Sequence, residues 1–278
     1  MDNHSQPRYE RVTGTLGAIV HGVDPADGFA PLLASGLTEA LHVHGVLFFH
    51  ASRPFDNDAY EAFARNFGEV RAPERNRTGA DSRVTSVDSE VTSPEMYRVN
   101  CWHTDVAWQE CPPQAATLKP EILPAVGGDT MWASMYAAWD ALSARYQQLL
   151  DGLEAVQSTA ALIRQCAADI DPTRFGPANI ASAVHPVVLR DPVTQRRMLY
   201  VNSNWTDRIV GMKPTESAQL IQMLNEHVNT PEFHVRLRWT PNTVAVWDQR
   251  VTQHRAVSDY TGQRRLLRTT IIGDKPRA

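Results

Sequence analysis

Three side chains that can hold one metal ion constrain this chain more than any other feature of its sequence. His103 and Asp105 lie two residues apart, and His254 follows much later, near the C-terminal end. On an extended segment, residues two apart point to the same side, so His103 and Asp105 face one point while Thr104 turns away. A fold that brings His254 to that point forms a two-histidine-one-carboxylate facial triad, a ligand set typical of Fe(II).

The His-Xaa-Asp pair alone has a simpler interpretation, in which both side chains form hydrogen bonds in a loop. Such pairs are common by chance, and most of the ten histidines must be something other than ligands. Two arginines strengthen the metal hypothesis. Within a strand, Arg264 and Arg268 share a face while Arg265 points the other way, and a buried arginine requires an anionic partner. The alternative is a solvated face of an edge strand.

Composition sets broad limits on the class of protein. A chain of 278 residues can form one large domain, and we predict a single domain over residues 1–278. The net charge of -4 argues against a general nucleic-acid binder. The odd number of cysteines, without a CxxC pair, argues against a disulfide scaffold or a zinc ribbon and fits a reducing cytoplasm. Neither a secretory signal nor a membrane-spanning apolar run is recognisable, so we expect a cytoplasmic protein.

The spacing of apolar residues predicts an α+β protein, mainly β, with an antiparallel β-core and helices packed outside. Helices are expected at residues 32–41, 58–67, 137–150 and 216–228. The second of these has Asp56 or Asn57 as its cap and Gly68 as its stop. Strands are expected at residues 12–20, 46–49, 184–189, 198–201, 235–239, 244–247 and 264–272. The irregular segments 71–97 and 160–180 are candidates for active-site loops, the latter as a mobile lid.

Three sequence blocks together resemble a known enzyme family. Residues 102–106 read Trp-His-Thr-Asp-Val, residues 127–132 read Gly-Gly-Asp-Thr-Met-Trp, and residues 247–254 read Trp-Asp-Gln-Arg-Val-Thr-Gln-His. Their order and spacing resemble the TauD/TfdA (taurine dioxygenase) family of Fe(II)/2-oxoglutarate-dependent dioxygenases, over nearly the whole chain. The resemblance implies a double-stranded β-helix, or jelly roll, with flanking helices. It also implies Fe(II) as cofactor, with 2-oxoglutarate and O2 as co-substrates.

The resemblance carries roles onto individual residues. His103, Asp105 and His254 match the three iron ligands, and Thr130 matches the threonine that hydrogen-bonds the distal carboxylate of 2-oxoglutarate. An intact carboxylate ligand also separates this chain from halogenating relatives, which lack it.

The arginine that binds 2-oxoglutarate has two candidates, because the spacing here departs by one residue from the family pattern. Counting forward from His254 selects Arg265, whereas counting back from residues 273–274 selects Arg264 and keeps Arg268 four residues further on. We prefer Arg264 for the co-substrate and Arg268 as its neighbour facing the substrate, and a one-residue deletion after Tyr260 explains the shift. Arg265 remains the alternative.

Substrate specificity is the least determined part of the prediction. The positions that hold taurine in the taurine enzyme correspond here to Pro73, Asn76 and Val99, so taurine itself is doubtful. Trp205 is either a pocket wall or part of the core. The candidate substrate-binding residues are Val99, Asn100, Ser158, Thr159, Trp205 and Arg268.

These features predict an oxygenase that couples decarboxylation of 2-oxoglutarate, giving succinate and CO2, to hydroxylation of a small anionic substrate. A sulfonate, an alkyl sulfate or a carboxylate would fit Arg268, and a natural-product tailoring oxygenase is the alternative. A zinc hydrolase leaves the arginine pair without a purpose, and a non-catalytic sensor gains nothing from open metal positions. We expect a small-molecule substrate, neither nucleic acid nor membrane as a partner, and a homo-oligomer, dimer or tetramer.

Overall fold

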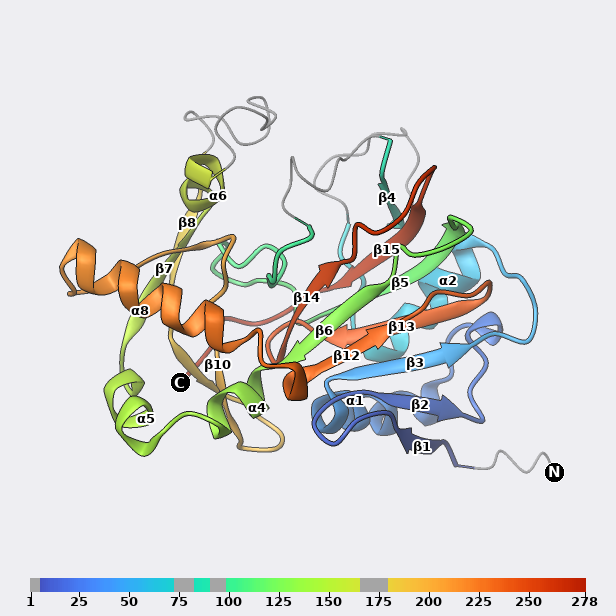
Figure 1. Cartoon of the computed structure of the whole chain (residues 1–278). Coiled ribbons are helices and arrows are strands. Elements are labelled where there is room, and N and C mark those ends of the chain that lie inside the picture. Colours follow the sequence, from blue (N-terminus) through green and yellow to red (C-terminus); the bar gives the residue numbers. More distant parts are fainter. Residues whose placement is uncertain (1–5, 73–82, 91–98, 166–179) are drawn as a thin grey trace.

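The protein is built on a large sheet against which a second, smaller sheet packs (Figure 1). The computed structural model describes residues 6–72, 83–90, 99–165 and 180–278. The large sheet has seven strands in the order β1-β2-β3-β13-β5-β15-β4, and of its pairings that of β2 with β3 is parallel. The strands are β1 Arg8–Arg11, β2 Ala18–His21, β3 Val46–His50, β4 Thr85–Asp88, β5 Ala115–Ile122, β13 Thr243–Asp248 and β15 Arg265–Ile271.

The second sheet lies over the inner face of the large one and carries part of the candidate site. Its strands, in spatial order, are β12 His234–Leu237, β6 Thr130–Ser134 and β14 Thr252–Ala256. Trp132 of β6 packs with Trp247 of β13 and Leu266 of β15 in one buried apolar cluster. Because strand side chains alternate between faces, His254, paired with Trp132, also points into the space between the sheets.

Two helices cover the outer face of the large sheet. They are α1 Pro31–His44 and α2 Asn57–Ala64. Phe63 of α2 packs edge-on against Phe49 of β3, and both belong to a second buried cluster. Asp56 caps α2 by accepting a hydrogen bond from the backbone N of Ala59. A 3-10 turn continues to Gly68, whose φ of 133° suits glycine, and a Cβ there would lie 2.7 Å from the Ile271 side chain. The predicted cap and stop are therefore confirmed.

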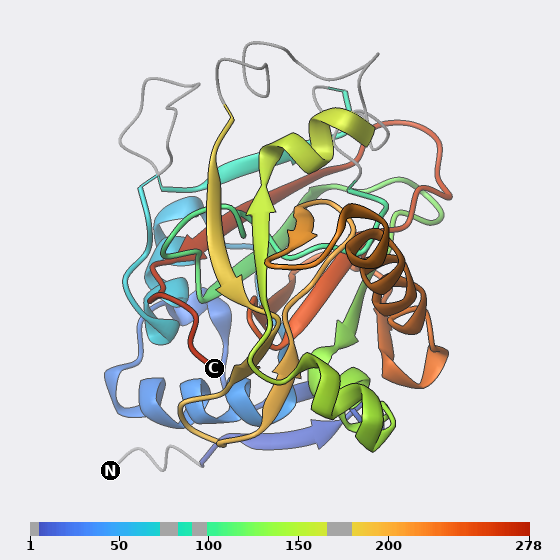
Figure 2. The same ribbon diagram turned by 90° about the vertical axis from the view of Figure 1, so that its left-hand side faces the viewer.

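A third layer contains the remaining strands and helices (Figure 2). One three-stranded sheet has the order β11-β7-β8, and β9 pairs with β10. The strands are β7 Glu154–Ser158, β8 Ser182–Pro186, β9 Val188–Arg190, β10 Arg197–Leu199 and β11 Thr206–Ile209. The helices are α4 Met135–Asp140, α5 Ala144–Leu150, α6 Thr159–Gln165 and α8 Pro214–His227. Their apolar side chains form a third buried cluster that includes Trp102, Trp139 and Trp205.

Several predicted elements differ from the structure. The helix expected at 137–150 is two helices: α4 ends at Asp140, and Ser143 caps α5 by accepting from the backbone N of Tyr146. Of the strand expected at 12–20, residues 18–20 belong to β2, whereas residues 12–17 connect β1 to β2. Segment 71–97 contains strand β4, so it is not loop throughout, and residues 73–82 and 91–98 lie outside the described residues. Segment 160–180 begins within α6, and residues 166–179 lie outside the described part.

The observed architecture is mainly sheet with flanking helices, as expected. Strands β1, β5, β6, β7, β11 and β14 were not predicted, although β6, β7 and β14 carry the site candidates Thr130, Ser158 and His254. Within the described ranges, no helix combines the length and the apolar character needed to cross a membrane.

Candidate active site

The structure brings His103, Asp105 and His254 to one point. Between His103 and His254 the backbones exchange two hydrogen bonds, with N–O distances of 3.1 and 2.9 Å. The Asp105 carboxylate lies 3.8 Å from Nε2 of His103 and 3.6 Å from Nε2 of His254. Thr104 turns away, as predicted, and donates to the backbone O of Thr252 at 3.2 Å. The three side chains are buried and their ligand atoms lie within 4.8 Å of one another, so they can hold a metal ion.

Burial and hydrogen bonding prepare these side chains for a cation. Nδ1 of His103 donates to the backbone O of Cys101 at 2.8 Å, which leaves the Nε2 lone pair facing Asp105. Burial lowers the pKa of His103 and lowers that of His254 to about 3, so both rings are neutral, the form that binds metal. Burial opposes the charge on Asp105, but Arg268 and the two histidines outweigh it and hold the carboxyl pKa below its ordinary value.

Two residues hold the Asp105 carboxylate in place. The Gln249 side chain donates to Oδ2 of Asp105 at 2.5 Å and accepts from the backbone N of Asp105 at 3.2 Å. Arg268 donates to Oδ1 of Asp105 at 3.2 Å. Gln249 was not among the predicted site residues, and Arg268 was expected to contact the co-substrate and the substrate rather than a metal ligand. Gln249 is fully buried, and a buried amide needs a partner, but this burial is visible in the structure and not in the sequence.

A second polar centre joins Arg264 to Thr130. Arg264 is only 5% exposed, and its Nε donates to the backbone O of Gly128 at 2.7 Å while Nη2 donates to Oγ1 of Thr130 at 3.1 Å. Within the described residues its guanidinium forms no ion pair, since the nearby Asp129 carboxylate bonds Arg236 at 2.6 Å. Burial lowers the Arg264 pKa, because the charged guanidinium is held away from water without an anionic partner among the described residues.

The surroundings of this centre leave room and donors for an anion. Thr130 Oγ1 also accepts from the indole Nε1 of Trp239 at 3.0 Å, so its own hydrogen remains available to a further acceptor. At Gly128, where φ is 72°, a Cβ would lie 3.0 Å from the Arg264 side chain. Arg265 points elsewhere, bonding Asp88 at 2.7 Å. The geometry thus brings Arg264, not Arg265, to Thr130.

The predicted substrate residues occupy two other places. Ser158 ends β7 and Thr159 begins α6, and their hydroxyls bond the backbone of Ala181. Trp205 is buried in the third cluster with its ring 4.2 Å from that of Trp108, and its backbone O accepts from Ser158 N at 2.7 Å. Packing thus accounts for the position of Trp205, and its contact with substrate stays a prediction.

Val99 and Asn100 precede the metal motif directly. The backbone O of Val99 accepts from Ala256 N at 2.7 Å, which ties it to β14 two residues beyond His254. Asn100 lines a cavity described below. The structure does not bring Ser158, Thr159 or Trp205 into a described contact with the metal-ligand candidates, and substrate contacts of all five residues remain predictions.

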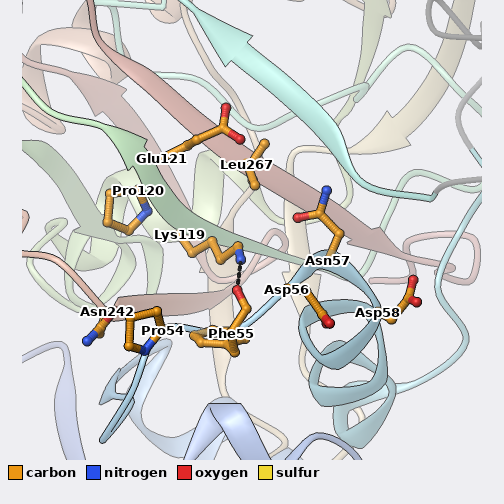
Figure 3. A pocket seen from close by; sticks show the side chains of 10 residues that line it. All are labelled: Pro54, Phe55, Asp56, Asn57, Asp58, Lys119, Pro120, Glu121, Asn242 and Leu267. Atoms are coloured by element: carbon orange, nitrogen blue, oxygen red, sulfur yellow. Dashed lines mark hydrogen bonds between the residues drawn. The ribbon is translucent and has the colours of Figure 1, made fainter.

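Neither of two cavities contains the candidate metal ligands. One, of about 600 Å³, opens at the start of α2 (Figure 3). Lys119 reaches into it, donating to the backbone O of Phe55 at 2.8 Å, with Nζ 4.4 Å from the centre of the Phe55 ring. Its charge is therefore already engaged. The other cavity, of about 510 Å³, lies beside residues 100–102.

A buried His-Asp-His site beside a buried arginine, Arg264, that forms no ion pair among the described residues is typical of oxygenases of the facial-triad class. The family model "Taurine catabolism dioxygenase TauD, TfdA family" matches residues 8–270, and the chain belongs to that family. It is an Fe(II)/2-oxoglutarate-dependent dioxygenase, using Fe(II), 2-oxoglutarate and O2.

Individual relatives match over almost the full chain. An alpha-ketoglutarate-dependent sulfate ester dioxygenase from Pseudomonas putida is 34% identical, over 95% of this chain and 89% of the relative. An alkylsulfatase from Acinetobacter baylyi is 31% identical, over 97% and 86% of the two chains. The crystal structure of a taurine dioxygenase from Burkholderia xenovorans superposes with a TM-score of 0.81 at 32% identity, covering 98% of this chain and 93% of that one.

Proposed function

We propose that this dioxygenase oxidises a small organic sulfate ester or sulfonate, with Fe(II) held by His103, Asp105 and His254. The buried convergence of these three side chains is the observation that carries the proposal. Two neutral imidazoles and one carboxylate suit Fe(II), and they leave the remaining metal positions for co-substrate and oxygen. When bound, the iron supplies the oxidising chemistry, while the protein positions the reactants and excludes water.

Arg264 and Thr130 would bind the distal carboxylate of 2-oxoglutarate. The buried guanidinium lacks an anionic partner among the described residues, and a carboxylate offers the planar pair of acceptors that matches its fork. The Thr130 hydroxyl would donate the second contact, since its oxygen already accepts from Arg264 and Trp239. Gly128 keeps the approach open, because any side chain there would meet Arg264.

Arg268 would hold the substrate's anionic group beside the metal. It is partly exposed, at 22%, and already touches the metal-ligand candidate Asp105, so a sulfate bound to it would lie close to the iron. At Val99 an apolar side chain gives an amine no hydrogen-bond partner, which disfavours taurine. The names of the two relatives, a sulfate ester dioxygenase and an alkylsulfatase, support an alkyl sulfate.

For an alkyl sulfate the proposed reaction balances without another reactant. Hydroxylation at the carbon that bears the sulfate oxygen gives a hemiacetal sulfate, and one atom of O2 enters succinate as 2-oxoglutarate loses CO2. The hemiacetal C–O bond then breaks, giving an aldehyde and releasing inorganic sulfate and a proton. Because Arg268 would hold the departing sulfate, it would also stabilise the charge that develops on the leaving group.

The test is succinate and sulfate formation with Fe(II), 2-oxoglutarate and oxygen, across alkyl sulfates, alkanesulfonates, taurine and aryloxyalkanoates. We expect equimolar succinate, aldehyde and sulfate from an alkyl sulfate of intermediate length, and little stimulation by taurine. Stimulation by carboxylate substrates alone would contradict the sulfur-oxyanion assignment while leaving the dioxygenase class intact.

We further propose a jelly-roll arrangement of the two facing sheets within a single domain over residues 1–278. The contact of Trp132 with Trp247 and Leu266 across the sheets supports one continuous core. A cytoplasmic homo-oligomer remains our proposal. Free thiols at Cys101 and Cys111 are consistent with a reducing compartment.

A further inference from the structure

A cavity of about 510 Å³ lies behind the two backbone segments that carry the histidine candidates. Its walls include Trp102, next to His103, and Arg255, next to His254. Arg255 is paired in register with Met131 and His254 with Trp132, so the two side chains point to opposite faces of the small sheet. The cavity therefore lies on the outer face of this sheet, and it contains none of the proposed ligands of iron or 2-oxoglutarate.

One face of α8 closes the other side of the cavity. Residues on that face recur at helical spacing and include Ala218, Ile221 and Asn225, and Asn229 follows in the turn after the helix. The Asn229 side chain accepts a hydrogen bond from the Trp102 indole at 3.0 Å and so fixes the wall on the metal-motif side. The volume falls within the range of ordinary small-molecule sites, roughly 300–1,000 Å³.

Arg255 is the unusual group in this cavity. Its Nε is buried and has no hydrogen-bond partner among the residues that the structure describes, and its Nη2 lies 3.8 Å from the Met131 sulfur. The guanidinium carbon lies 5.3 Å from the centre of the Trp102 ring. Within the described residues it makes no ion pair with any carboxylate. Arg255 lines the cavity and is half-buried, so the positive charge of its guanidinium lacks a protein counterion among these residues, and an anion entering the cavity would supply one.

The acidic side chains of the cavity do not fill this role. Asp207 is engaged by Arg164 and by Arg208, the latter at 2.7 Å. Glu226 is exposed and accepts from the side chain of Gln222 at 2.8 Å. Both carboxylates line the cavity, but among the described residues neither forms an ion pair with Arg255. Its guanidinium is therefore the group that can pair with a ligand.

We propose that this cavity is a second binding site, for a small organic anion whose carboxylate or sulfate group pairs with Arg255. The apolar part of the ligand would lie along Ile221 and Ala218 of α8. Such a ligand would touch both segments that carry the histidine candidates, from the side opposite the metal. It would not compete with iron or 2-oxoglutarate, because none of their proposed ligands lines the cavity.

The test is calorimetric titration of hexanoate into the full-length enzyme loaded anaerobically with Fe(II) and 2-oxoglutarate. Arg255→Gln should weaken hexanoate binding about tenfold or more, because a charged hydrogen-bonded pair is lost. Arg255→Lys should weaken it less, since the charge remains. Glu226→Gln should tighten binding, because it removes a like charge from the same cavity.

Two controls separate this site from the proposed active site. Arg268→Gln and Arg264→Gln should leave hexanoate affinity within about twofold, because neither arginine lines the cavity. From acetate to hexanoate, each methylene that becomes buried should tighten binding about three- to fourfold, and Ile221→Ser should flatten this dependence. Equal affinity in wild type and Arg255→Gln, loss of binding in Arg268→Gln, or absence of saturable binding would each overturn the proposal.

Discussion

Two buried clusters in this protein contain the same kinds of side chain and differ in which of their lone pairs are already used in hydrogen bonds. His103, Asp105 and His254 form one, and His42, Asp191 and Asp248 form the other. In each cluster the candidate ligand atoms lie within 4.8 Å of one another. Residue type and proximity therefore do not distinguish them.

The hydrogen bonds do distinguish them. In the second cluster Asp191 accepts from Nδ1 of His42 at 2.7 Å and from the backbone N of Thr194 at 2.6 Å. Arg250 donates hydrogen bonds to both carboxylate oxygens of Asp248, at 3.1 and 2.6 Å. The ring nitrogen of His42 that faces the carboxylates is thus already used.

In the first cluster Nε2 of His103 and Nε2 of His254 lie 3.8 and 3.6 Å from Asp105, beyond hydrogen-bond distance, although Asp105 itself bonds Arg268. The comparison teaches that a metal site is recognised by unused lone pairs rather than by its residue types.

The largest expected effect comes from removing the carboxylate of the first cluster. Asp105→Ala should abolish stoichiometric iron binding and lower 2-oxoglutarate-dependent succinate formation more than about a hundredfold, since it removes a ligand outright. Bound iron is measured by a chelation assay on protein reconstituted under nitrogen. The matched change Asp191→Asn should retain one iron per chain. Iron loss in Asp191→Asn, with iron retained in Asp105→Ala, would reverse our assignment.

The two neighbouring arginines provide the next test. Arg264→Ala should raise the half-saturating 2-oxoglutarate concentration about thirtyfold or more, because a buried charged pair is lost. Arg265→Ala should change it less than about twofold, since that side chain pairs with Asp88 instead. Initial rates at saturating substrate give both values. A larger effect from Arg265→Ala would show that Arg265 binds 2-oxoglutarate and that the one-residue deletion after Tyr260 was assigned wrongly.

Gln249 offers a smaller effect specific to the metal centre. Gln249→Leu should weaken metal affinity about 10- to 100-fold, because Asp105 loses the amide that orients it. Competition between the protein and a fluorescent chelator for Co(II) measures this without turnover. Gln253→Leu is the control, since its amide bonds the backbone O of Val201 instead. That variant should lose thermal stability and keep its metal affinity; equal affinity losses would make Gln249 merely structural.

The smallest effect concerns acid stability of the second cluster. Hydrogen bonds from His42 and from backbone amides outweigh burial and lower the Asp191 pKa. A lowered carboxyl pKa contributes stability that is present above the unfolded value of about 4 and is lost as pH falls below it. Urea unfolding of the metal-free protein at stepwise lower pH measures this effect. Below about pH 4 the free energy of unfolding should fall less steeply for Asp191→Asn than for wild type. Parallel curves would argue against this linkage.

The sequence predicted local features well because they depend on short-range chemistry. The Asp56 cap, the Gly68 stop and the arrangement of His103, Thr104 and Asp105 follow from neighbouring residues and from the two-residue period of extended chain. The break between α4 and α5 was not predicted. The helical spacing of apolar residues continues through Ser143, so the role of Ser143 as the cap of α5 was not recognised.

Long-range partners could not be predicted in the same way. Nothing near Gln249 in the sequence reveals that its amide meets Asp105, and nothing near Arg268 reveals that it shares that carboxylate. Strands β6 and β14 were overlooked because they mix polar site residues with apolar ones, which obscures the alternation. Their pairing is what places the histidine candidates together.

The backbone bridge between His103 and His254 has a consequence for the lifetime of the enzyme. Since main-chain hydrogen bonds already join the two residues, the spacing of the imidazoles is fixed by the sheet and not by the ion. The chain does not need to refold when iron departs. Iron lost through oxidation should then be replaceable by free Fe(II), so that a molecule inactivated in this way regains activity.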